Sequence, residues 1–128
     1  MARTALIAYL SIPALLAAGT FASALRYEPF GPQMLLAYVV GGFLFYAAPH
    51  LLWGIVAALC KFSGAVKHAG FIAACLALAA IAVMSFVVHD PSGLPIQWLL
   101  YWPLALVLQV GMAGASALYL HRRRSVGA

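Results

Sequence analysis

The fold is decided by residues 69–88, which read AGFIAACLALAAIAVMSFVV and contain no charged side chain. A helix needs about 20 apolar residues to cross the hydrocarbon core of a membrane, so this segment is a minimal span. Three further apolar runs, at residues 4–25, 33–60 and 97–120, accompany it. We therefore expect an all-α membrane protein with four transmembrane helices in a compact bundle.

The composition excludes a soluble globular domain. Hydrophobic residues make up 66% of the 128 residues and charged residues 7%, whereas an average soluble domain is about a quarter charged. So few charges cannot cover a water-exposed surface. Residues 1–128 are thus expected to form one transmembrane domain with short loops and no soluble domain.

Two of the apolar runs have unusual features. The first ends in the small-x-small pattern of residues 22–24, but it is longer than the apolar core of an ordinary signal peptide, so we expect a retained helix. The second is longer than the membrane is thick and must tilt, bend or protrude. Pro49 is a cause for bending, because it removes the hydrogen bond to the carbonyl of Phe45.

The basic residues predict the orientation. The net charge is +5, and these charges flank apolar segments, so the expected partner is the lipid bilayer and not nucleic acid. With the N-terminus inside, only Arg26 of the seven basic residues is translocated. The positive-inside rule therefore favours a bacterial inner-membrane protein with both termini in the cytoplasm. The basic residues on that side are then Arg3, Lys61, Lys67, Arg122, Arg123 and Arg124.

Aromatic residues gather at the expected outer end of the fourth helix. Trp98, Tyr101 and Trp102 lie there, and Asp90 lies in the loop before them. Such rings anchor helices at the level of the lipid headgroups. Because tryptophan and tyrosine also dominate binding hot spots, these four residues are a candidate partner-binding surface.

Two polar side chains are expected deep in the membrane. His50 follows Pro49 in the second run, and Gln109 lies at similar depth in the fourth. A buried histidine or glutamine in hydrocarbon needs a hydrogen-bond partner, so the two are expected to pair. We interpret the pair as stabilising helix packing, with a substrate or cofactor role as the alternative.

Small residues predict how the helices pack. They form stripes at helical spacing, which let helices approach closely in lipid. The stripes are Gly70, Ala73, Ala74 and Ala77 in the third run, Gly111, Gly114 and Ala115 in the fourth, and Ala14 and Ala18 in the first. Packing within the bundle explains all three, and a homo-oligomer is a further use of one of them.

No residue pattern predicts an enzyme or a cofactor. The chain has no nucleophile elbow, metal-ligand cluster or carboxylate pair. No acidic residue lies within a span, unlike in the small multidrug exporters, which keep a glutamate in the first helix; a proton-driven pump is thereby disfavoured. Of the four histidines only His50 is deep, so a haem held by two histidines would need a second chain.

By elimination, we expect the protein to act by binding another membrane protein. It is then either an accessory subunit of a larger complex or an immunity protein against a membrane-inserting toxin. In being small, polytopic and inner-membrane, the chain resembles known immunity proteins against pore-forming colicins, and that resemblance implies neutralisation of a pore-forming bacterial toxin. The alternatives are a transporter or channel with a polar path at His50, Gln109 and Tyr46, and a haem-bearing electron-transfer anchor.

Overall fold

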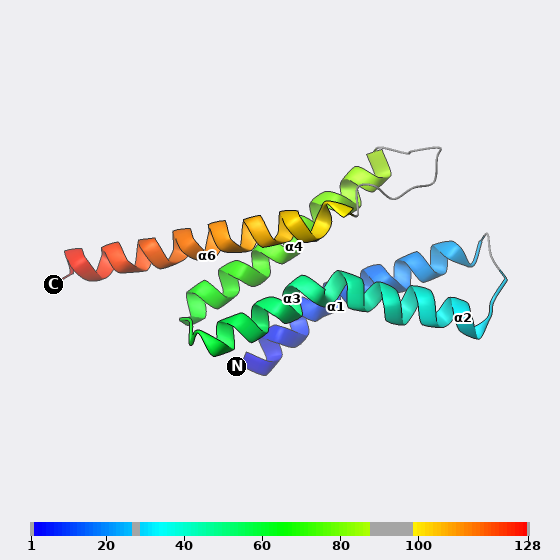
Figure 1. Ribbon diagram of the computed structural model, residues 1–128, viewed down its shortest axis with the longest axis horizontal. Coiled ribbons are helices and arrows are strands. Elements are labelled where there is room, and N and C mark those ends of the chain that lie inside the picture. Colours follow the sequence, from blue (N-terminus) through cyan, green and yellow to red (C-terminus); the bar gives the residue numbers. More distant parts are fainter. Residues whose placement is uncertain (1, 27–28, 88–98, 128) are drawn as a thin grey trace. The chain divides into compact units, whose positions relative to one another are not determined.

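The computed structural model describes residues 2–26, 29–87 and 99–127. Within these ranges it contains helices joined by short turns and no strand (Figure 1). Four helical stretches are long and apolar enough to cross a membrane: Arg3–Ala24, Pro32–Leu59, Gly64–Met84 and Tyr101–Val126. The prediction of an all-α chain with four candidate membrane spans is confirmed.

The chain divides into two compact units, Met1–Leu51 and Leu52–Ala128. The division falls inside one helix, α3 (Gly42–Leu59), shortly after its internal proline, Pro49. Each unit is described by itself.

The first unit consists of α1 (Ala2–Ala24) and the start of a second long helical run. That run comprises α2 (Pro32–Leu35), the π-helical segment η1 (Leu36–Gly41) and the beginning of α3, which follow one another without a break (Figure 1). The run begins at Pro32 because a proline in the first turn has a preset φ and sacrifices no helical hydrogen bond. The wider π-turn accommodates an extra residue within the helix.

Within the first unit, α1 packs against η1 through a different face from the one expected. Pro13 and Ala17, one helical turn apart, are buried, whereas Ala14 and Ala18 are exposed. A Cβ atom on Gly42 would lie 3.8 Å from the Cβ of Ala17, which is ordinary contact. The small residue that admits the second helix is therefore Ala17.

The second unit is built around α4 (Gly64–Val87). This helix packs along α6 (Tyr101–Val126), as Figure 1 shows. The predicted stripe on α4 is confirmed as a buried face, since Ala73, Ala74 and Ala77 have no exposed surface.

On α6 the buried face differs from the predicted stripe. Tyr101, Ala105, Gln109 and Ala113 are buried at intervals of four residues, whereas Gly111, Gly114 and Ala115 are exposed. Both faces of this helix carry small residues, and periodicity alone does not select between them. The helix also continues through the basic run to Val126, beyond the expected end at Leu120. Cations in the last turn stabilise a helix because they oppose the negative end of its dipole.

The connection between α3 and α4 is shorter than the gap between the apolar runs at residues 33–60 and 69–88, because α3 ends at Leu59 and α4 begins at Gly64. α3 ends in a Schellman motif, in which the Lys61 N–H donates to the Ala58 carbonyl at 3.3 Å and the Phe62 N–H donates to the Ala57 carbonyl at 3.1 Å. Lys61 takes the left-handed position of this motif, with φ 51°.

Trp53 of α3 holds the next helix in place. Its indole Nε1–H donates to the Lys67 carbonyl at 2.9 Å, and its ring lies 5.7 Å from the ring of Phe62. Because α4 begins at Gly64, Lys67 and the following histidine are helical. The Trp53 side chain of α3 therefore contacts both the turn, at Phe62, and the start of α4, at Lys67.

Candidate functional site

The structure describes part of the predicted partner-binding surface. Asp90 and Trp98 lie outside the described residues. Tyr101 is fully buried, whereas Trp102 is 47% exposed. Tyr101 thus belongs to the buried side of α6, while Trp102, the next residue in the first turn of the helix, remains accessible. Of the two described residues, Trp102 is the one that a partner can reach.

Two other exposed apolar side chains flank Trp102 at this end of α6. Leu99 precedes it and Leu106 follows about one turn later, both on the same side of the helix. Together these three side chains form the Trp102 surface. It lies at the end of α6 opposite to the basic run.

The predicted polar pair consists of two buried side chains. His50 has no exposed surface and Gln109 is 4% exposed. His50 belongs to the first unit and Gln109 to the second. Their hydrogen bond therefore stays a prediction.

Within the first unit, His50 is the last member of a buried polar row. Its ring is hydrogen-bonded to the backbone of Tyr46, one turn earlier on α3. The Tyr46 side chain is itself hydrogen-bonded to the side chain of Thr20 on α1. The Thr20 hydroxyl also lies 2.8 Å from the Ala17 carbonyl of its own helix. This row joins α1 to α3, and the sequence reasoning missed Thr20.

The described residues contain no group of three or more metal-ligating side chains close enough to hold an ion. The two cysteines are separate thiols, Cys60 being exposed and Cys75 partly buried.

A pocket of about 340 Å³ lies in the second unit, between the α3–α4 turn and the C-terminal part of α6. Lys61, Ser63, His121 and Arg124 are its polar lining residues. Its apolar lining residues are Phe62, Val66, Ala117 and Leu120. We call it the basic pocket. Five of the six basic residues expected on the cytoplasmic side belong to the second unit. Of these, Lys61 and Arg124 line the pocket, whereas Lys67, Arg122 and Arg123 do not.

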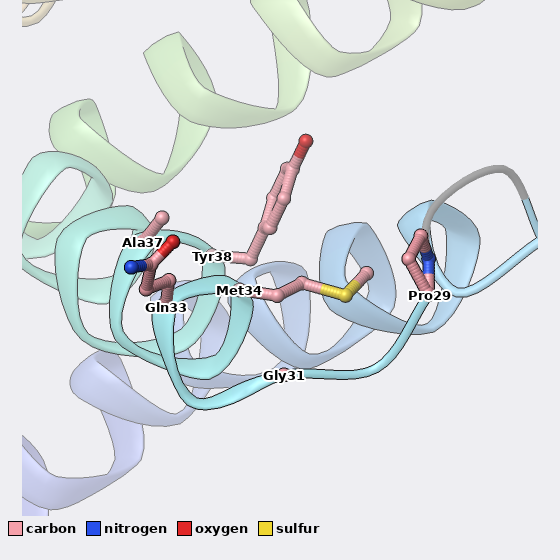
Figure 2. A pocket seen from close by; sticks show the side chains of 6 residues that line it. All are labelled: Pro29, Gly31, Gln33, Met34, Ala37 and Tyr38. Carbon is pink, nitrogen blue, oxygen red and sulfur yellow. The ribbon is translucent and has the colours of Figure 1, made fainter.

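A second pocket, of about 450 Å³, lies in the first unit at the start of α2. In Figure 2 the Met34 side chain points across it toward Pro29, while the Tyr38 ring extends in another direction. Gln33 and Tyr38 are the polar side chains that the described residues contribute to it, and these residues contribute no charged side chain. No pattern in the sequence predicts this pocket, because its walls depend on how the loop at Gly31 approaches the helix.

Comparison with known proteins finds no significant match, whether to a family model, to a curated protein or to a solved structure.

Proposed function

We propose that the chain is inserted in a bacterial inner membrane through its four candidate spans, with both termini in the cytoplasm. The basic pocket then lies at the cytoplasmic face, and the Trp102 surface lies at the outer face. The charge distribution supports this orientation, because it leaves six of the seven basic residues inside.

We propose further that the protein acts by binding another membrane protein at the Trp102 surface. The observation that carries this proposal is the 47% exposure of Trp102, in the first turn of α6 and next to the buried Tyr101. An indole offers a large flat apolar area and one N–H donor, which is the combination found in binding hot spots. The exposed leucines around it supply the apolar border that excludes water from such a contact.

Two kinds of partner fit this surface. One is a membrane-inserting toxin, which arrives from the periplasm and meets the outer face first; the protein is then an immunity protein. The other is a subunit of a larger membrane complex, of which this chain is an accessory part. A toxin gene directly beside this one favours the first, and genes for a respiratory or secretion complex favour the second.

Site-specific photo-crosslinking tests the proposal. A photoreactive side chain at position 102 should give a discrete protein adduct in intact cells. Tyr119 is the matched control, since it is an exposed aromatic residue on the same helix near the opposite end. An adduct from position 102 and none from position 119 supports binding at the outer face. Lipid adducts alone at position 102 would show that the tryptophan is only an anchor.

The buried row of Thr20, Tyr46 and His50 favours a second candidate, a small transporter or channel. Polar side chains inside a membrane span often line a substrate path. If they do so here, His50→Leu abolishes uptake by reconstituted vesicles without lowering the amount of folded protein. A haem-bearing anchor predicts instead a Soret band in the purified protein, which His50→Leu removes.

A further inference from the structure

The basic pocket combines cationic and apolar walls at one end of the second unit. Lys61 and Arg124 bring two positive charges to it, and His121 and Ser63 add hydrogen-bonding groups. Phe62, Val66, Ala117 and Leu120 line its apolar side. A ligand that binds to both the cationic and the apolar residues of this pocket must carry a negative charge next to an apolar group.

Lys61 is presented to this pocket by a fixed turn. The left-handed position of a Schellman motif is usually glycine, because a side chain there is disfavoured. Lys61 occupies it with φ 51°. The contact between Trp53 and Phe62 and the hydrogen bond from Trp53 to Lys67 tie the turn to both neighbouring helices. The backbone of Lys61 is thus fixed at the edge of the pocket.

Only one of the three consecutive arginines lines the pocket. Ala117, His121 and Arg124 follow one another at intervals of four and three residues, so they share a face of α6. The Arg123 guanidinium lies over the ring of Tyr119, 4.9 Å from its centroid, and Arg122 is not part of the lining. Arg124 is therefore the arginine of this run that can act on a ligand together with Lys61.

We propose that the basic pocket binds the phosphate group of an anionic phospholipid. The proposal rests on the membrane location given above and is independent of the Trp102 surface. A guanidinium can bind two phosphate oxygens at once, while a lysine acts as a point charge. Basic pockets between membrane helices on the cytoplasmic side are suited to lipid headgroups. The apolar wall distinguishes a lipid phosphate from free phosphate, since only a lipid has an acyl chain to place there.

Binding is measured by native mass spectrometry of the protein in neutral detergent, titrated separately with phosphatidylglycerol, phosphatidylcholine and inorganic phosphate. We expect one phosphatidylglycerol to be retained. Arg124→Gln should weaken its binding about tenfold, which corresponds to about 1.4 kcal/mol. Arg122→Gln is the matched control, because it removes the same charge two residues away and should change the affinity less than about twofold.

Lys61→Gly separates loss of binding from loss of folding. Glycine relieves the left-handed backbone, so the lipid-free protein should unfold at an equal or higher temperature, while the affinity for phosphatidylglycerol falls. Equal weakening by Arg122→Gln and Arg124→Gln would overturn the proposal in favour of general charge attraction. If phosphatidylcholine bound as tightly as phosphatidylglycerol, the proposal that the pocket requires an anionic lipid would be wrong. If inorganic phosphate alone saturated the pocket, the ligand would be the free ion and not a lipid. Extraction of the protein from membranes by alkaline carbonate would instead overturn the membrane location.

Discussion

Gly70 lies where α4 passes closest to a large side chain of α3. A Cβ atom at this position would overlap the Trp53 indole, so any side chain forces that ring to move. Gly70→Ala should therefore destabilise the protein by about 1–3 kcal/mol, the usual range for overpacking. Thermal unfolding in detergent measures the effect.

Gly54→Ala is the matched control for this substitution. It also lies inside a helix, but the nearest atom to its added Cβ is Cζ of Phe71 at 3.7 Å, an ordinary contact. Its stability should be unchanged or higher, because alanine favours the helix over glycine by about 0.5–1 kcal/mol. Similar losses from both substitutions would contradict the tight contact between Gly70 and Trp53.

Lys61 is expected to lower the stability of the lipid-free protein. A non-glycine residue in the left-handed region lowers the free energy of unfolding by roughly 1–2 kcal/mol. A glycine there lowers it by about 0.5–1 kcal/mol, because glycine loses more chain entropy on folding. Lys61→Gly should therefore stabilise the chain by about 0.5–1 kcal/mol, whereas Lys61→Val should destabilise it. Thermal unfolding without added lipid checks both changes, and a loss with glycine would contradict the left-handed conformation.

Between elements, the hydrogen bond between Tyr46 and Thr20 joins α3 to α1. Hydrogen bonds between membrane helices average about 0.6 kcal/mol, so Tyr46→Phe and Thr20→Val should each destabilise modestly, and their effects should not add. Unfolding of the two single variants and the double variant in detergent measures the coupling. Tyr46→Phe combined with Ser11→Ala is the control cycle, since the Ser11 hydroxyl donates to the Ala8 carbonyl within α1 itself. Additivity in both cycles would show that the hydrogen bond contributes nothing.

The elements themselves could be predicted in part from the sequence. The four spans and the buried stripe of Ala73, Ala74 and Ala77 follow from apolar length and helical spacing alone. No comparable pattern predicts the π-helical turn at Leu36–Gly41. In α6, Ala105 is buried and Gly111 is exposed. Helical spacing does not predict this choice, because small residues lie on both faces of the helix.

The basic pocket shows why the sites were harder to predict. Lys61 and Arg124 were each expected near the membrane surface, but their common pocket joins residues far apart in the chain. Only the packing of α4 along α6 brings them together. Likewise, Tyr101 and Trp102 are neighbours in sequence, and only the rotation of α6 decides that Trp102 is exposed.

For the whole molecule, the pairing of His50 with Gln109 would join the two units. His50→Leu and Gln109→Leu should then each destabilise modestly, by about 0.6 kcal/mol for a lost interhelical hydrogen bond, plus the effect of the polar group left behind. A double-mutant cycle of unfolding free energies measures the coupling. Strict additivity would show that the two side chains do not meet.

The central claim is that four helices cross the membrane with the basic pocket inside and the Trp102 surface outside. The most direct test fuses a reporter that is active only in the periplasm at two points of the chain. The claim predicts an inactive fusion after Arg124 and an active fusion at Ser92. Activity after Arg124 and none at Ser92 would contradict the orientation, and with it both proposed binding surfaces.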